Sequence, residues 1–272
     1  MLEQLKYINH VNEVFEFGKD GIFVDMNELH DYEWSVTSKG NRISNLSRSV
    51  STRKLPVKII CSTAEEGIAA RNRLLEVCEK DVLAMQHGQI IIGDYYFRCY
   101  VTKSSKANYL INKRYIEITL TLTSDYPFWV KESNQPFRPS GVDGDGLDYP
   151  FDYEFDYFTV LASTTIFNSS FVETNFRLII YGYAVDPMIT IDNHIYQVKG
   201  TVEAGQYLVV DSTTKKIYLV QQNGTQINKF NDRNKESYIF EKIPSGESPV
   251  SWDGTFGFDI VLMEERSEPK WT

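Results

Sequence analysis

The chain has 272 residues, 42% of them hydrophobic, which is enough for two ordinary domains or one large β domain with a sizeable core. Its net charge of −9, from 28 basic and 37 acidic residues, argues against a protein that holds nucleic acid through phosphate contacts. The sequence has no basic segment leading into an apolar one at its start and no run of eighteen apolar residues, so we expect neither a secretory signal nor a membrane span.

The residue composition favours β structure. Aromatic residues make up 14% of the chain, and the apolar runs are short, rich in Thr and Val, and separated by turn residues. Aromatic and β-branched side chains fit the pleated surface of a sheet. We therefore predict a mainly β protein.

The first part of the chain predicts short strands and one long polar excursion. Residues 13–17 and 22–26 flank a tight turn with a glycine at each end, which predicts a hairpin or a close relative of one. Residues 37–54 are polar, basic and without apolar periodicity, so we expect a long exposed loop or a protruding hairpin that makes contacts. Residues 56–62 alternate as a strand.

One convincing helix is expected over about residues 63–80. Thr63 is followed at the third helical position by Glu66, the pattern of a capping box. An apolar stripe, interrupted by Arg71, predicts the face that packs on a sheet. Its members are Ala64, Ile68, Leu75, Cys78 and Val82.

Two alternating β segments follow, at residues 89–104 and 113–130. In the second, Ile116, Ile118, Leu120 and Leu122 share one face of the predicted strand. We assign residues 1–132 to an N-terminal domain that is a small antiparallel β domain, similar to a split barrel, with one helix.

A segment dense in Gly, Pro and Asp, residues 133–150, predicts a linker. The C-terminal domain then covers residues 151–272, where strands recur about every ten residues with turn signals between them. This spacing predicts a β-sandwich or jelly roll. In its last strand, Phe256, Phe258, Ile260 and Leu262 fall on one side.

The linker contains three aspartates that could suggest calcium, because oxygen ligands at alternate positions suit a hard cation. They are Asp143, Asp145 and Asp148. The glycine and glutamate positions of an EF-hand do not follow, so we assign no metal site.

Aromatic and acidic residues alternate directly after these aspartates. As a strand, residues 149–157 would place rings on one face and carboxylates on the other. The alternatives are an aromatic strand at the seam between domains, a sugar-stacking platform, and a pair of catalytic carboxylates, Asp152 and Glu154, of a glycosidase.

No other residues suggest chemistry. Cys61, Cys78 and Cys99 lie in apolar segments and are expected to be reduced core thiols. The four histidines lack metal spacing, and no nucleophile-elbow, phosphate-loop or zinc-protease motif occurs. We predict no enzyme, cofactor or metal.

The order of these features resembles the distal tail protein (Dit) family of long-tailed phages and prophages. The resemblance covers the whole chain: a β domain with one helix that ends in "TSDYPFWV", a Gly/Pro/Asp/aromatic linker, a second β domain, and the final run "FDIVLMEERSEPKW".

This resemblance implies a fold and a set of partners. It implies a six-fold ring made by the N-terminal domain, with a galectin-like C-terminal sandwich projecting outward. It implies a structural hub at the tail tip that joins the tail-tube and tape-measure proteins to the tail-associated tip protein and to receptor-binding or baseplate proteins. It also implies a final location in the virion. The reduced cysteines and the lack of an export signal fit assembly in the bacterial cytoplasm, and the charge and hydropathy predict neither tight nucleic-acid binding nor a membrane.

Eight residues are predicted to lie at interfaces or at the domain junction, and residues 37–54 are the expected contact between subunits or between rings. The eight are Arg42, Arg48, Arg53, Trp129, Tyr149, Phe151, Tyr153 and Phe155. A carbohydrate-binding module and a cell-wall hydrolase remain the alternatives from other functional classes.

Overall fold

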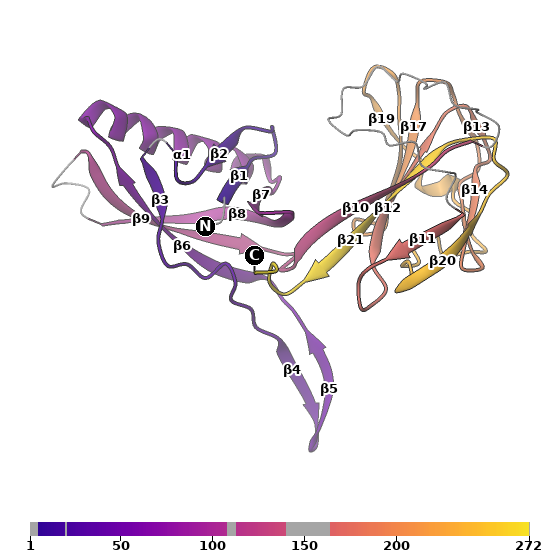
Figure 1. Ribbon diagram of the computed structural model, residues 1–272, viewed down its shortest axis with the longest axis horizontal. Coiled ribbons are helices and arrows are strands. Elements are labelled where there is room, and N and C mark those ends of the chain that lie inside the picture. Colours follow the sequence, from indigo (N-terminus) through magenta and orange to yellow (C-terminus); the bar gives the residue numbers. More distant parts are fainter. Residues whose placement is uncertain (1–4, 20, 108–112, 140–163, 272) are drawn as a thin grey trace. The chain divides into compact units, whose positions relative to one another are not determined.

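The computed structural model describes residues 5–19, 21–107, 113–139 and 164–271. The chain divides into two compact units, which are Met1–Lys131 with Glu265–Thr272 (unit 1) and Glu132–Glu264 (unit 2). Strands β10 (Trp129–Phe137) and β21 (Phe258–Arg266) each belong partly to unit 1 and partly to unit 2 (Figure 1). Both units are mainly β, as predicted.

Unit 1 is an antiparallel β structure built around the long strand β8. The first half of β8 pairs with β7 and β10, and from Tyr100 on it pairs with β9, with a register shift between Val101 and Lys103. Pairing continues from β7 through β1 to β2, and from β9 through β6 to β3. The strands are β1 (Leu5–Ile8), β2 (Val14–Glu16), β3 (Ile22–Val24), β6 (Ser51–Ile60), β7 (Gly88–Ile92), β8 (Tyr95–Ala107) and β9 (Tyr115–Ser124).

Strand β9 confirms the predicted alternation. Its buried and half-buried residues alternate along the whole strand, and Ile116, Ile118, Leu120 and Leu122 are all buried in the core of unit 1. A side-chain period of two places every second residue on the core face. The sequence pattern therefore determines which side of β9 faces inward.

The predicted hairpin of residues 13–26 is wrong in its pairing, although its tight turn is present. The amide of Gly18 donates to the carbonyl of Ile22. The strands on either side of the turn then separate, because β2 pairs with β1 while β3 pairs with β6.

Helix α1 (Ala64–Ala84) begins as predicted and ends four residues later than expected. The Thr63 side chain accepts from the amide of Glu66, whose carboxylate in turn accepts from the amide of Thr63. At the other end, Met85 adopts a left-handed conformation and its amide donates to Val82.

The predicted inward face of α1 is wrong for all but one of its residues. Of that stripe only Cys78 is buried. Leu75 and Val82 are half-buried, Ala64 and Ile68 are exposed, and all four lie outside the core cluster of unit 1. The helix instead buries a neighbouring face. Its buried residues are Gly67, Ala70, Leu74, Val77, Cys78 and Asp81.

Residues 35–47 form a two-stranded hairpin, so of the two predictions for this segment the protruding hairpin is confirmed. Strand β4 (Ser35–Lys39) pairs with β5 (Arg42–Ser47), and every residue of both strands is exposed. The connection is Gly40–Asn41, with φ +62° at Gly40, which suits a two-residue hairpin turn. Figure 1 shows this ribbon extending away from the other strands of unit 1.

Unit 2 is a sandwich of two antiparallel sheets, which confirms the predicted C-terminal fold class. One sheet has the order β19-β18-β17-β12-β21, and the other has the order β11-β20-β14-β15. Apolar side chains from both sheets form one core cluster that includes Leu178, Ile189 and Phe258. Phe256, Phe258, Ile260 and Leu262 are all buried, as predicted.

The smaller elements complete unit 2. Strands β13 and β16 form a separate two-stranded sheet, and η1 is a 3-10 helix. The elements of unit 2 are β11 (Thr165–Asn168), β12 (Asn175–Tyr181), β13 (Ala184–Val185), β14 (Met188–Ile191), β15 (His194–Gln197), β16 (Thr201–Val202), β17 (Tyr207–Asp211), β18 (Lys216–Val220), β19 (Gln226–Asn228), η1 (Phe230–Asp232) and β20 (Gly246–Ser251).

Two segments differ from the predicted domain plan. Residues 133–137, expected in the linker, are the second half of β10, where Phe137 is buried and stacks on Phe258 with ring centroids 4.7 Å apart. Residues 265–272 group with unit 1, where Trp271 stacks on His30 at 4.0 Å. Each segment contains an aromatic residue that contacts another ring of its unit.

Helix α1 is the one α-helix in the described ranges, and no helix there is long and apolar enough to cross a membrane.

Candidate functional site

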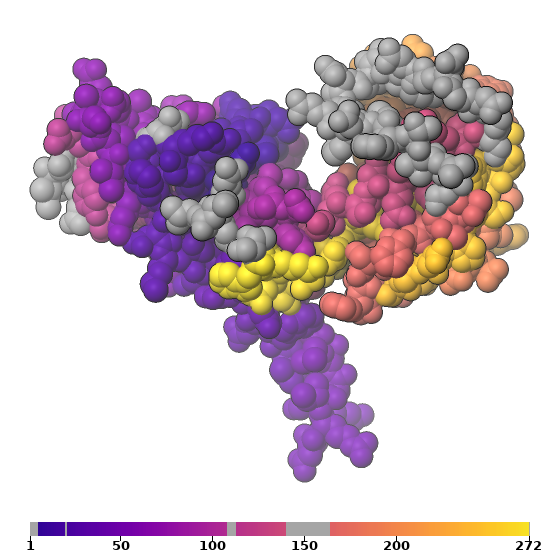
Figure 2. Space-filling view, viewed as in Figure 1, coloured from indigo at the N-terminus to yellow at the C-terminus, as the bar shows by residue number. Residues whose placement is uncertain are grey.

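The β4–β5 hairpin concentrates positive charge in an acidic chain. Residues 34–50 contain Lys39, Arg42 and Arg48 and no acidic residue, whereas the whole chain has a net charge of −9. The hairpin stands clear of the rest of unit 1 in the space-filling view (Figure 2). An exposed segment of opposite charge to its protein is suited to contact an acidic partner surface.

The hairpin has one apolar and one polar face, and a β-bulge creates this division. Val36 lies opposite Leu46, and Ser38 lies opposite Ile43, because the register shifts between Thr37 and Ser38. Residues opposite each other, and residues two apart on a strand, share a face. Without the extra residue, Ile43 and Leu46 would point to opposite sides.

The bulge therefore gathers three exposed apolar side chains on one side. Val36, Ile43 and Leu46 are 58%, 66% and 53% exposed. The other face is entirely polar. By the same register it carries Ser35, Thr37, Lys39, Arg42, Asn45 and Ser47.

At the base of the hairpin, Arg48 packs among aromatic rings. Its guanidinium carbon lies 5.2 Å from the centroid of the Trp34 ring and 4.9 Å from that of Phe128, with Tyr32 at 5.7 Å. Partial burial lowers the pKa of Arg48. Its Nε and Nη1 atoms are buried without a hydrogen-bond partner among the described residues. The contact gives the hairpin base a cation–π anchor.

Arg53 and Trp129 lie in the core of unit 1 and not on its surface. Both are almost fully buried, and both donate to the carbonyl of Leu29, the indole nitrogen of Trp129 at 3.1 Å. The Arg53 guanidinium stacks over Phe97 at 4.3 Å, and burial lowers its pKa to about 10. These two residues support the segment that leads into the hairpin.

The other predicted interface residues divide into two groups. Arg42 is exposed near the hairpin turn, opposite Lys39, so its side chain can reach a partner. The aromatic run of residues 149–157 lies outside the described residues, as do the aspartates considered for calcium, Asp143, Asp145 and Asp148. That run includes Tyr149, Phe151, Tyr153 and Phe155.

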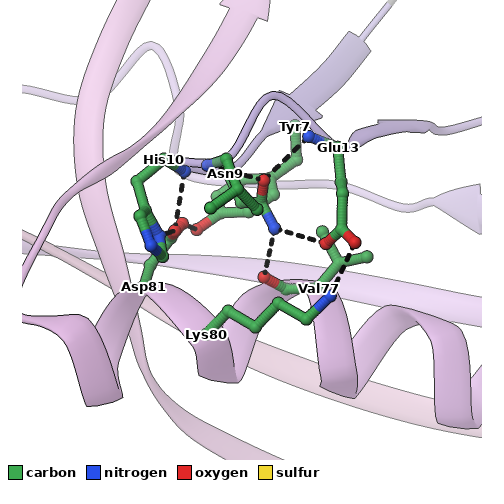
Figure 3. Close-up of polar contacts among 8 residues, drawn as sticks. Tyr7, Asn9, His10, Glu13, Val77, Lys80 and Asp81 are labelled. Carbon is green, nitrogen blue, oxygen red and sulfur yellow. Dashed lines mark hydrogen bonds and ion pairs between the residues drawn. The ribbon is translucent and has the colours of Figure 1, made fainter.

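A buried polar cluster holds the end of α1 against the β1–β2 turn (Figure 3). The carboxylate of Asp81 is fully buried and accepts from the Tyr7 hydroxyl, from the His10 amide at 2.8 Å and from His10 Nδ1 at 2.6 Å. Asn9 donates to the carbonyl of Val77 and to the carboxylate of Glu13. These bonds satisfy the Asp81 carboxylate, so the cluster serves as a structural tie.

A shallow depression of about 450 Å³ lies beside this cluster and has no Asp, Glu, Lys or Arg in its lining. Within it, burial and the neighbouring Arg98 lower the pKa of His87, which favours the neutral imidazole. Among the described residues, no three His, Cys, Asp or Glu side chains come together as metal ligands. The lining residues are Ile8, Asn9, His10, Asn12, Met85, Gln86, His87, Gln89 and Tyr100.

Sequence reasoning identified the hairpin segment but missed its division into faces. Ile43 and Leu46 are three residues apart, a spacing that places them on opposite sides of a regular strand. The bulge that brings them together has no signal in the sequence of residues 42–47. Trp34 and Phe128, which hold Arg48, also lie outside the predicted set.

The sequence matches no protein-family model and no curated protein sequence. The fold matches a chain in the structure of the phage P2 baseplate in its activated conformation with Ca. The TM-score is 0.65 at 12% identity, and the match covers 99% of this chain and 100% of that chain. The corresponding structure with Sr gives the same values.

A second phage protein matches over both units as well. SPP1 Dit, described as a paradigm of the hub adsorption apparatus in phages that infect Gram-positive bacteria, has a TM-score of 0.59 at 11% identity, covering 96% of this chain and 99% of that one. This chain has the Dit fold. The expected resemblance is confirmed at the level of the fold, because the matches cover 96% to 99% of this chain.

Proposed function

We propose that the chain is a structural hub of a phage or prophage tail tip. The observation that carries this proposal is the match of 96% to 99% of the chain to SPP1 Dit and to a phage baseplate chain. Dit-fold proteins in those particles are parts of a baseplate and of a hub adsorption apparatus. The virion is the location that follows for this chain.

In the proposed assembly, unit 1 forms a six-membered ring and unit 2 projects outward. The ring connects the tail tube and tape-measure protein to the tip protein and to receptor-binding or baseplate proteins. The acidity of the chain supports this role, because an acidic subunit repeated around a channel repels the DNA that passes through it. The exposed, basic hairpin with Arg42 supplies a contact between copies, and Arg48 stabilises its base.

The proposed role is one of shape and assembly and not of catalysis. The carboxylate of Asp81 is held in a network of structural hydrogen bonds, and the matched structures are those of a phage baseplate and of the SPP1 Dit hub protein.

Negative-stain images of the purified chain at high concentration test the proposal. We expect rings with a central hole, and addition of tail-tube or tip proteins from the same particle should produce larger complexes that retain the ring. Single subunits in every field, with no complex formed after mixing, would refute the proposed function.

A further inference from the structure

The loop between β11 and β12 in unit 2 holds two apolar side chains out in water. Phe171 is 92% exposed, the largest exposed fraction of any large apolar side chain in the described residues, and Val172 beside it is 62% exposed. Figure 1 shows the loop extending beyond the ends of the two strands. Turns are ordinarily built from polar residues and glycine, so an aromatic residue at the tip indicates a contact outside unit 2.

Hydrogen bonds from within unit 2 hold this loop in place. The buried side-chain amide of Asn168 donates to the carbonyls of Val172, at 3.3 Å, and of Ile243, at 3.1 Å. Its side-chain oxygen accepts from the amide of Ser170, whose carbonyl accepts from the hydroxyl of Ser245. Asn and Ser side chains that bond to nearby backbone groups stabilise one conformation of a turn. The loop is therefore preorganised.

A preorganised aromatic side chain is suited to anchor a protein partner. Aromatic residues that enter a pocket of the partner contribute a large share of the binding energy at interfaces. A rigid loop loses less conformational entropy on binding, so more of the contact energy appears as affinity. Phe167 lies near the end of β11, between buried neighbours, and its exposed ring adds apolar surface beside the loop.

The charge around the loop indicates the kind of partner. Residues 165–174 and 241–249, which form the loop and the segment beside it, contain three acidic residues and one basic residue, Lys242. The three acidic residues are all exposed, and they are Glu173, Glu241 and Glu247. Glu247 lies opposite Phe167 in the register of β11 and β20. Like charges disfavour contact with a second copy of the same surface or with an anionic lipid surface, so a basic protein surface fits best.

We propose that residues 169–173, the Phe171 loop, are the surface by which unit 2 binds another protein of the particle. Phe171 fills an apolar pocket on that protein, and Lys or Arg residues border the pocket. This inference rests on the proposed hub role and names the surface of unit 2 that holds a peripheral component. Ring formation by unit 1 does not involve this loop.

Substitutions at Phe171 test the anchor. The probes are the purified receptor-binding and baseplate proteins of the same particle, and biolayer interferometry measures their binding to the immobilised full chain. Phe171→Ser should weaken the binding of one of them by about tenfold or more, whereas Phe171→Leu should retain most of it. Ser169→Ala, at an exposed position of the same loop, should leave binding near wild type. Equal binding by Phe171→Ser and wild type would overturn the inference.

The rigidity and the charge of the surface are tested by changes outside the anchor. Ser245→Ala removes the hydrogen bond to the carbonyl of Ser170, so it should weaken binding by a smaller factor than Phe171→Ser. Glu247→Lys reverses a charge opposite Phe167 and should weaken binding more at low ionic strength than at high ionic strength. Tighter binding by Glu247→Lys would overturn the assignment of a basic partner.

Two further measurements separate the inference from its alternatives. Light scattering should give Phe171→Ser the same ring mass as the wild type, and loss of the ring would overturn the inference, since the loop would then serve self-association. Flotation with phosphatidylglycerol vesicles should show no bound protein. Vesicle binding by the wild type that Phe171→Ser abolishes would overturn the inference in favour of a membrane contact.

The failure of this inference and the failure of the hub role are distinguishable. Wild-type rings that bind none of the probe proteins would overturn the inference and leave the proposed hub role standing. A wild-type chain that forms no ring and joins no tail protein would overturn both.

Discussion

At the scale of single residues, the core of unit 1 contains several buried polar side chains that are held by hydrogen bonds. Asp81 receives three hydrogen bonds, and Arg53 and Trp129 share the carbonyl of Leu29. Buried groups with this many partners stabilise one arrangement of the chain, because the loss of any partner leaves an unsatisfied polar atom. The same environment determines how the cysteines behave.

The three cysteines should differ sharply in reactivity. Burial, followed by the nearby Asp81, raises the pKa of Cys78 to about 12, and burial also raises the pKa of Cys99. Both are therefore protonated thiols at neutral pH, whereas Cys61 is only half-buried. At pH 8 a colorimetric thiol reagent should label one thiol rapidly in the folded protein and three in denaturant. Rapid labelling of all three in the folded state would contradict this description of the core.

Asp259 in unit 2 should make stability depend on pH. Burial raises its pKa above the ordinary value of 3.8, although hydrogen bonds from Tyr181, at 2.9 Å, and Asn134 act in the opposite direction. The folded chain thus holds this proton more tightly than the unfolded chain. Asp259 therefore destabilises the fold as the pH rises through its raised pKa, and the penalty disappears below the ordinary value.

Asp259→Asn should therefore raise the melting temperature at pH 7, and the difference from wild type should shrink as the pH falls toward 3.8. Tyr181→Phe removes a hydrogen bond to the carboxylate, so it should lower the melting temperature more at pH 7 than at low pH. Differential scanning calorimetry from pH 3 to pH 8 measures both effects. A pH-independent difference for Asp259→Asn would contradict the proposed burial.

At the scale of elements, α1 depends on a capping box that the sequence already predicts. Thr63 and Glu66 satisfy each other's amides in the first turn. Thr63→Ala should cost about 1 kcal/mol of unfolding free energy. Ser62→Ala, one residue outside the box, should cost much less. Urea denaturation followed by circular dichroism gives the loss of unfolding free energy for both variants. Equal losses would contradict a specific contribution of the Thr63 cap.

Elements with one dominant local pattern were predictable, and elements with two competing patterns were not. Strand β9 has a single alternating row, and Thr63 begins a recognised cap, so both were predicted correctly. Helix α1 has two apolar rows, and periodicity alone cannot tell which one meets the sheet. Strand β3 pairs with the distant strand β6, and this pairing depends on tertiary packing and not on the tight turn that precedes β3.

The candidate site shows the same limit. Its position in residues 37–54 followed from polarity and charge, which are local properties. The apolar face of the hairpin did not, because it depends on the bulge near Thr37 and Ser38. The burial of Arg53 and Trp129 could not be predicted either. Their hydrogen bonds to the carbonyl of Leu29 join residues 24 and 100 positions apart, a separation that no short sequence pattern reveals.

At the scale of the whole molecule, the chain presents surfaces suited to assembly. Its Dit fold extends over both units, its charge is strongly negative, and its one wholly exposed hairpin in the described ranges is basic. In the proposed hub, each basic hairpin would lie against an acidic neighbouring copy. The account therefore depends on whether copies of this chain associate into a closed ring with a fixed number of subunits.

Multi-angle light scattering of the wild-type chain, at rising loading concentration after size-exclusion chromatography, measures that number. We predict a species with six times the 31.4 kDa mass of one chain, or twice that for paired rings, whose share grows with concentration. A mass of 31.4 kDa at every loading, unchanged when tail-tube or tip proteins are added, would contradict the account.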